Sequence, residues 1–482
     1  MKKNFYLTTT LPYVNAEPHI GFALELVQAD IIARYRHLLG DDVFFSTGTD
    51  EHGLKIYRRA IEEGKDTQAY VDEYAEKFQA LKKKLDLYPE LHFIRTTDAR
   101  HVRAAQELWR RCLAKGDIYK KKYKGLYCVG DEAFVKESDL VGGKCPNHQA
   151  LELVEIEEEN YFFKLSAYQE KLLVYLKEEG VVVPEWRRQE AIQFVQRGLE
   201  DFSVSRVKEK MPWGIPVPDD DTQVMYVWFD ALTNYISTLG WPEDTERNFK
   251  KYWEEGVTLQ LAGKDQVRFQ SIMWQAMLLS GGLPTTSRVF YHGFITSGGQ
   301  KMSKSIGNVI DPIAIVDEYG TDALRYFLAR HVHPFEDSDV TMERFKEAYN
   351  ADLVNGLGNL VARVMKLAEV HIESPAHLVD RDSYIGAANI HIDEDIGKFQ
   401  LNRVLDEIWS RIKELDEAMA KREPFKLVKE KPEEGKAVIL SMAAQLYGIG
   451  LVLEPFMPDT SKKIQDAIRA NKKPENLFPR KE

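Results

Sequence analysis

Two different periods of apolar residues follow one another along the first quarter of the chain. The stretch FYLTTT is short, apolar and β-branched, which predicts a strand. The next stretch, ALELVQADIIARY, has Leu24, Val27, Ile31 and Ile32 at helical spacing, which predicts a helix. DVFFSTGTD and YVDEYAEKFQALKKKLDL then repeat the same order. Residues 4–115 therefore predict an α/β fold with a doubly wound, Rossmann-like parallel sheet.

The pattern changes at three points further along the chain. Residues 116–220 contain short strand-like runs between Gly, Pro and charged clusters, which predicts a small inserted α+β domain. Residues 221–298 return to strand–helix alternation and complete the sheet domain that residues 1–115 begin. Residues 299–350 follow as a loop and connecting region. Residues 351–482 have apolar residues at 3.6 spacing, which predicts a C-terminal α-helical bundle.

Composition narrows the class of protein. The chain has 482 residues, 44% hydrophobic and 29% charged, as in globular proteins. No apolar run approaches the ~20 residues that span a bilayer, so no membrane partner is expected. The start MKKNFYLTTT lacks the apolar segment of a signal peptide, and three cysteines give no disulfide framework, so we expect a cytoplasmic protein. The net charge of −11 argues against general polyanion coating but allows local phosphate-binding patches.

A His and a Gly lie in PHIGF, where the first strand gives way to the first helix. A helix N-terminus offers unpaired N–H groups and partial positive charge, which suit phosphate. Gly21 lets a ligand approach the backbone, and His19 can donate to a phosphate oxygen. The alternative is that His19 caps the helix and Gly21 relieves packing. Four residues alone favour this alternative.

A second stretch, GGQKMSKS, changes that balance. Lys301 and Lys304 lie among Ser and Gly residues, which predicts a cationic loop able to close on a triphosphate. Each well-placed donor to a developing phosphate charge is worth ~2–4 kcal/mol. The alternative for these two lysines is an ordinary solvated loop. The two stretches together favour a nucleotide site.

PHIGF with KMSKS resembles the paired ATP signatures of class I aminoacyl-tRNA synthetases. Further stretches resemble the methionyl-tRNA synthetase family in particular, and they occur in the family's order over nearly the whole chain. They are LPYVNAEPHIG, TGTDEHG, YVWFDALTNYI, GKDQVRFQSIMWQAML, FITSGGQKMSKSIGN and YGTDALRYFLAR. The resemblance implies that methionine and ATP form methionyl-adenylate, whose aminoacyl group then passes to the methionine tRNA. The protein supplies mainly positioning and charge stabilisation.

The resemblance also implies roles for individual residues. His19 and Gly21 would hold ATP, Lys301 and Lys304 would stabilise the leaving pyrophosphate, and Mg²⁺ would bridge the phosphates. Asp265 would contact the ribose. Asp50 would bind the α-amino group of methionine, inside a pocket whose apolar walls suit a thioether. The pocket would be lined by Leu11, Tyr13, Trp228, Ala231, Tyr235 and Phe269, although aromatic residues at strand ends more often pack in a core.

The chain departs from the family pattern at three positions of the candidate site. Phe22 stands where the family has a second His, and a phenyl ring cannot donate to phosphate. Either the remaining groups carry the phosphates alone or the site is slower; we expect an active enzyme. Gln270 stands where many relatives have a His beside the pocket and can still donate one hydrogen bond, and Leu232 stands where some relatives have a Pro.

The insertion contains a possible zinc site. Cys128 and Asp131 are three residues apart, as are Cys145 and His148. Relatives with a zinc knuckle have Cys-x-x-Cys and Cys-x-x-His at these places, so Asp131 replaces one thiolate. Zinc accepts Asp oxygen, so this donor set is chemically sound. The alternative is two buried thiols and a surface His, because other relatives keep the fold without the metal. Cys112, on the apolar face of AAQELWRRCLAK, is expected to pack in the core.

The C-terminal regions would contact tRNA. The resemblance implies that residues 299–350 contact the tRNA stem and that residues 351–482 bind the anticodon. Asn359 and Arg363 are four apart on one helix face and would contact anticodon bases. Phe425 aligns with a stacking Trp of the family, and base stacking is worth ~1–3 kcal/mol. For Phe425 we expect core packing instead.

Two rival functions remain open at this point. One is a class I synthetase for another amino acid, such as Leu or Val, but an insertion of roughly 100 residues is small for an editing domain. The other is a catalytically weakened relative that only binds tRNA or a nucleotide, which Phe22 supports and the intact KMSKS opposes. Because the chain ends at Glu482 without a further dimerising domain, we expect a monomer.

Overall fold

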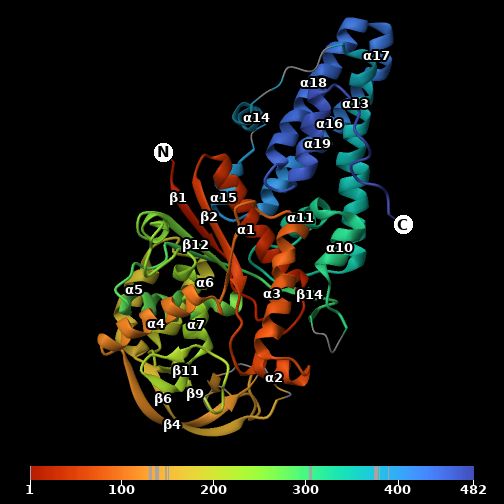
Figure 1. The fold of residues 1–482 in the computed structure, drawn as a ribbon. Helices are drawn as coiled ribbons and strands as arrows, with labels where there is room; N and C mark the ends of the chain where they lie inside the picture. Colours follow the sequence, from red (N-terminus) through yellow and green to blue (C-terminus); the bar gives the residue numbers. More distant parts are fainter. Residues whose placement is uncertain are drawn as a thin grey trace. The chain divides into compact units, whose positions relative to one another are not determined.

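The chain folds into two compact units, whose elements are labelled in Figure 1. In the computed structural model the first unit comprises Met1–Pro18, Arg36–Lys82 and Tyr88–His292, and the second comprises His19–Tyr35, Lys83–Leu87 and Gly293–Glu482. The structure describes residues 2–129, 133–135, 140–146, 149, 151–302, 307–373, 378, 380–388 and 390–481.

A parallel sheet organises the first unit. In the described part of the chain it has six strands in the order β3-β2-β1-β12-β13-β7, which confirms the predicted sheet. Leu7 of β1 lies opposite Phe45 of β2 and Leu259 of β12. Strand order reverses between β1 and β12, so their carboxyl ends form a switch point, where ligands bind in such folds. The strands are β1 Asn4–Thr8, β2 Asp42–Thr49, β3 His92–Arg95, β7 Val182–Val183, β12 Val257–Gly263 and β13 Arg288–His292.

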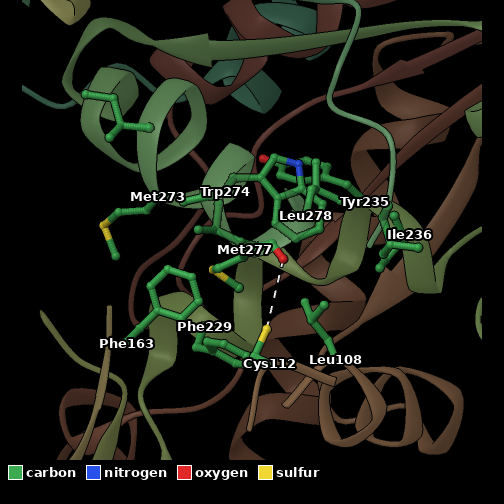
Figure 2. Close-up of a cluster of buried hydrophobic side chains, with 14 of the residues drawn as sticks. Leu108, Cys112, Phe163, Phe229, Tyr235, Ile236, Met273, Trp274, Met277 and Leu278 are labelled. Carbon is green, nitrogen blue, oxygen red and sulfur yellow. Dashed lines mark hydrogen bonds between the residues drawn. The ribbon is translucent and has the colours of Figure 1, made fainter. Parts of the chain in front are cut away.

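Helices and one dense apolar cluster accompany this sheet. Figure 2 shows side chains of α4, α7, α8 and α9 packed together in the cluster. Cys112 lies inside it with its Sγ 4.0 Å from the carbonyl oxygen of Met277, and burial raises the pKa of the thiol to about 12. The predicted packing role of Cys112 is confirmed. The helices are α2 Leu54–Glu62, α3 Thr67–Lys84, α4 Ala99–Ala114, α7 Val227–Leu232, α8 Asn234–Ser237 and α9 Trp274–Ser280.

The insertion is α+β, as predicted. Its long antiparallel pair, β4 with β6, places a lysine-rich strand against a glutamate-rich one, and Lys124 lies 3.0 Å from Glu155. Strand β7 belongs to the insertion by sequence but pairs with β13 at the edge of the parallel sheet. The sequence pattern did not predict this pairing. Its elements are β4 Ile118–Cys128, β5 Ala133–Val135, β6 Val154–Phe163, α5 Gln169–Lys177, α6 Glu185–Gln196, β8 Phe202–Ser203, β9 Ser205–Val207, β10 Pro216–Val217 and β11 Asp220–Met225.

The second unit holds most of α1 (Ile20–Leu38), a small sheet and the predicted helical bundle. Prolines open several of its helices, as expected for residues that lack an N–H group. Asp311 caps α10 by accepting from the backbone N–H of Ile313. The elements are β14 Ile295–Ser297, β15 Gln300–Lys301, α10 Pro312–Tyr319, α11 Thr321–Arg330, β16 Ser338–Asp339, α12 Met342–Ala348, a π-helical stretch Tyr349–Gly358, α13 Asn359–His371, α14 Arg381–Ala388, α15 Ile392–Gly397, α16 Leu401–Arg422, α17 Pro424–Glu430, α18 Pro432–Leu453 and α19 Pro458–Arg469.

One helix of the bundle corrects an expectation about apolar runs. By length and composition alone α18 could cross a membrane, although we expected no such stretch. Within the structure 56% of its most apolar window is buried, and the helix packs on α13, α16, α17 and α19. The central helix of a packed bundle has this same composition, because it is apolar on most of its circumference.

A buried ion pair ties α1 to α11. Nη2 of Arg325 lies 2.6 Å from Oδ2 of Asp30, and neither side chain has any exposed surface. Arg325 also donates to the backbone carbonyls of Leu85, Pro455 and Phe456. Asp30 accepts a second charged hydrogen bond, from Nε of Arg34 at 2.7 Å. These bonds join α1, α11, the 83–87 segment and the turn after α18.

We expect Asp30→Ala to lower the free energy of unfolding by ~3–5 kcal/mol, because it leaves a buried guanidinium without its counter-charge. Urea unfolding followed by circular dichroism measures the change. The control is Asp459→Ala, which breaks an exposed pair with Lys463 and should cost less than ~1 kcal/mol. Equal losses in the two variants would contradict the importance of the buried pair.

Candidate active site

Three loops that carry candidate residues leave the sheet at the carboxyl ends of its central strands. Leu11 and Tyr13 follow β1, Asp50 follows β2, and Asp265 lies in the turn Lys264–Gln266 after β12. Tyr13 forms a parallel bridge with Asp50, and the N–H of Asp50 donates to the carbonyl of Pro12 at 3.0 Å. The first two loops are therefore fixed to each other beside the switch point.

The predicted pocket residues on helices also come together. The rings of Trp228 and Phe269 stack with centroids 3.8 Å apart and planes 15° apart, which joins α7 to the π-helical turn Phe269–Met273. Ala231 and Tyr235 are buried on α7 and α8. Nε2 of Gln270 donates to the hydroxyl of Tyr235, so Gln270 makes the hydrogen bond expected of it.

Sequence reasoning missed a histidine and a carboxylate that join these segments. Nδ1 of His52 lies 2.7 Å from Oδ2 of Asp230, which links the loop after β2 to α7. Both residues lie inside the quoted motifs TGTDEHG and YVWFDALTNYI. An Asp flanked by apolar residues on a short helix was the available signal, because a buried charge requires a partner.

The corner at His19 differs from expectation in one respect. The N–H of Ile20 donates to the carbonyl of Ile310, and those of Phe22 and Ala23 donate to the carbonyl of His19. The N–H of Gly21 donates to Nδ1 of His19 at 3.1 Å. The helix N-terminus was expected to offer unpaired N–H groups to phosphate, and this is wrong here. His19 caps the helix itself, which leaves its exposed ring as the group that can meet an anion.

Because Nδ1 of His19 accepts a hydrogen bond, the neutral imidazole carries its proton on Nε2. Nε2 is then a hydrogen-bond donor. A Cβ added to Gly21 would lie 3.0 Å from Cε1 of His19 and 3.1 Å from its Nδ1. Gly21 therefore allows the close approach that fixes the ring.

The cationic loop begins next to this corner. A Cβ on Gly21 would lie 3.9 Å from Cε of Met302, so the loop and the corner are neighbours within the second unit. Gly298 and Gly299, with φ of 63° and 73°, form the two-residue turn between β14 and β15. Asp339 holds this turn by accepting from the N–H of Gly299 at 2.7 Å. Lys304 and the side chain of Lys301 lie outside the described residues.

The structure describes two members of the candidate zinc set. Cys128 ends β4, Cys145 follows a turn at Gly142 and Gly143, and both thiols are buried. Asp131 and His148 lie outside the described residues. Within the described ranges the structure shows no group of three or more His, Cys, Asp or Glu able to hold a metal.

In the bundle, Asn359 and Arg363 lie one turn apart on α13, as predicted. Nη1 of Arg363 lies 2.6 Å from Oδ1 of Asp416 on α16. Phe425, at the start of α17, is 44% exposed, so the expectation that it packs in the core is wrong. Its ring is available to a planar partner.

Comparison with known proteins agrees with this architecture. The family model for class I tRNA synthetases (M) matches residues 5–154 and 150–365. Methionine–tRNA ligase of Caldanaerobacter subterraneus is 43% identical over 479 residues, 97% of this chain and 74% of the relative. The Thermotoga maritima ligase is 40% identical over 98% of this chain and 76% of its own length. Mycobacterium tuberculosis methionyl-tRNA synthetase in complex with methionyl-adenylate has a TM-score of 0.88 at 37% identity, covering 97% of this chain and 94% of that one.

The switch-point sheet, the His19 corner and the neighbouring cationic loop thus define a class I aminoacyl-tRNA synthetase. Within that class the chain belongs to the methionine–tRNA ligase family. Its activity is the ligation of methionine to tRNA, which removes the rival assignment to another amino acid.

We expect Gly21→Ala to lower kcat/KM for ATP–pyrophosphate exchange by about 10- to 100-fold, because the new Cβ displaces the His19 ring by enough to misplace its donor. The matched control is Gly386→Ala on α14, where a Cβ meets nothing within 4 Å. Exchange kinetics measure both variants. Loss of activity in both, or in neither, would show that the close approach at Gly21 has no functional role.

Proposed function

We propose that the loops after β1, β2 and β12, with α7 and α8, bind methionine and the ribose of ATP. The supporting observation is that the residues predicted for this pocket, from segments far apart in sequence, share direct contacts: Tyr13 with Asp50, and Trp228 with Phe269. Asp50 binds the α-amino group, which has the opposite charge. The aromatic and aliphatic walls hold the thioether, and Asp265 accepts from a ribose hydroxyl.

His19, Lys301 and Lys304 bind the phosphates of ATP in this proposal. His19 donates from Nε2 to a phosphate oxygen, and Lys301 and Lys304 offset the charge on the leaving pyrophosphate. Mg²⁺ bound to ATP would neutralise part of the phosphate charge. The carboxylate of methionine attacks the α-phosphorus, and the bond to pyrophosphate breaks. A hydroxyl at the 3′ end of the tRNA then attacks the adenylate carbonyl and releases AMP.

Methionine-dependent ATP–pyrophosphate exchange tests this assignment. We expect exchange with methionine and none with leucine, valine or cysteine. Asp50→Asn should raise KM for methionine by about 10- to 100-fold, because a hydrogen bond to a charged group is worth ~1.5–3 kcal/mol. Glu243→Gln, which alters an exposed pair with Arg103 in the same unit, is the control. An unchanged KM in Asp50→Asn would contradict the proposed amino-group site, and absence of exchange would favour the weakened relative.

Residues 299–350 contact the tRNA stem and residues 351–482 the anticodon in this proposal. Arg363 is held by Asp416, so its guanidinium already projects from α13 before tRNA binds. Asn359 lies one turn earlier and offers an amide to base edges. The exposed ring of Phe425 offers a stacking surface to one base.

We expect Arg363→Ala to lower kcat/KM for tRNA aminoacylation by about 10- to 100-fold, because each good side-chain contact to a base contributes ~1–3 kcal/mol. Pyrophosphate exchange without tRNA should stay within about twofold of the unchanged protein, since that step does not involve the anticodon. Arg469→Ala, at an exposed arginine of α19, is the control. The same loss in both variants would indicate general electrostatics instead of base recognition.

Zinc at the insertion is a further part of the proposal. Cys128, Asp131, Cys145 and His148 would hold it, and the two buried thiols fit such a donor set. The metal would stabilise the insertion and take no part in the chemistry. Metal analysis should find one zinc per chain, lost in Cys145→Ser and kept in Cys112→Ala. A metal-free purified protein would show that the insertion folds without zinc.

We also propose that the protein is a monomer in the cytoplasm. The negative net charge of −11 favours mutual repulsion of copies in solution. Size-exclusion chromatography with light scattering measures the oligomeric state directly.

A further inference from the structure

A carboxylate without exposed surface lies between two imidazoles in the first unit. Oδ2 of Asp230 is 2.7 Å from Nδ1 of His52, and Oδ1 is 2.8 Å from Nε2 of His101. The other ring nitrogen of His101 lies 2.9 Å from the hydroxyl of Ser237. Because a carboxylate only accepts hydrogen bonds, the two facing ring nitrogens carry protons. The four side chains form one continuous chain of hydrogen bonds.

Asp230 remains ionised in this setting. Burial alone raises the pKa of its carboxyl, but the electrostatic interaction with His52 and hydrogen bonds from both imidazoles outweigh burial and lower it. A buried ionised group that loses either partner carries a large desolvation cost. The carboxylate therefore enforces the position of both histidines at once.

Each end of this chain of hydrogen bonds reaches a segment with proposed pocket residues. His52 follows Asp50 by two positions, Asp230 lies between Trp228 and Ala231 on α7, and Ser237 follows Tyr235 by two positions on α8. His101 belongs to the first turns of α4, whose Leu108 and Cys112 pack in the cluster of Figure 2. The pocket segments are thus tied to a helix in the dense core.

A tryptophan from outside these segments holds the His52 loop from another side. The indole N–H of Trp213 donates to the carbonyl of Glu51 at 2.6 Å, and the N–H of Gly53 donates to the carbonyl of Trp213. The Trp213 ring lies 5.6 Å from that of His52. Trp213 therefore holds the backbone on both sides of His52, and the bond to Asp230 fixes the side chain of His52 between these two contacts.

We infer that Asp230, with His52 and His101, is a positioning network that keeps the amino-group site at Asp50 in register with the side-chain walls on α7 and α8. This inference rests on the proposed methionine pocket. In this inference the network has no direct contact with methionine or ATP. It acts by pre-organising the pocket, so it determines the affinity for the amino acid and leaves the affinity for ATP and the rate of the bound complex nearly unchanged.

Steady-state pyrophosphate exchange with Asp230→Asn tests the inference. An amide of the same shape removes the negative charge, accepts from one imidazole and turns its NH₂ group toward the other, so that second ring must change tautomer to keep a bond and neither bond remains charge-assisted. We expect KM for methionine to rise at least 10-fold, with kcat within threefold and KM for ATP within twofold. His52→Gln, at a side chain that is 9% exposed where Asp230 has none, should raise KM for methionine at least fivefold and tests the same link if Asp230→Asn does not fold.

Two further variants separate positioning from stability and from the pocket itself. Thr286→Val removes a buried hydroxyl that bonds to Gln275 and Gln260, and it should lower the melting temperature without changing KM for methionine. Trp228→Ala should raise KM for methionine by removing a wall. If Trp228→Ala has no effect, the proposed pocket is wrong. If it raises KM while Asp230→Asn and His52→Gln do not, or if those two variants raise KM for ATP equally, the positioning network is wrong.

Discussion

The parallel pairing of β1 with β12 is the constraint on which the first unit depends. It brings together two strands separated by the whole inserted domain, and it sets the switch point between them. Loop-closure entropy grows slowly with length, at ~0.6 kcal/mol per doubling, so an insertion of this size is tolerated between paired strands. The exits of β1, β2 and β12 then meet at one edge. Loops that are far apart in the sequence thereby acquire a shared position, and the loops after β1 and β2 are also bonded directly to each other through Pro12 and Asp50.

In the first turn of α1, hydrogen bonds between His19 and its own neighbours decide which groups can bind an anion. His19 uses its carbonyl and Nδ1 to satisfy N–H groups that a bound phosphate could otherwise take. The backbone N–H groups are therefore not the anion site. The donor is instead the side chain of His19, whose tautomer is fixed with the proton on Nε2. Gly21 makes this possible, since any Cβ there would crowd the ring. Phe22 contributes its backbone N–H to the cap, so the aromatic replacement leaves the local backbone bonds in place.

The regular spacing of apolar residues is the feature of the sequence that predicted the fold correctly. Strand–helix alternation predicted the sheet and the 3.6 period predicted the bundle, because both patterns follow directly from which faces are buried. The contact between Trp228 and Phe269 needed the resemblance, since either aromatic residue alone fits a core equally well. The two partners of Asp230 could not be predicted, because they come from two distant segments that only the tertiary fold brings together. Phe425 was misassigned because a single Phe carries no periodic signal.

Each unit has a buried carboxylate on a helix that carries, or begins beside, a candidate site residue. Asp30 is on the helix that starts beside His19, and Asp230 is on the helix that carries Trp228. Well-packed apolar side chains at such positions are often as stabilising as an ion pair, because burial of charge has a large desolvation cost. Stability alone therefore does not account for them. Charged hydrogen bonds have narrow distance and angle requirements, so a carboxylate with two partners fixes the helix in one register, which apolar packing does less strictly. A site whose groups must be held within ~0.5 Å of the productive geometry needs that kind of support.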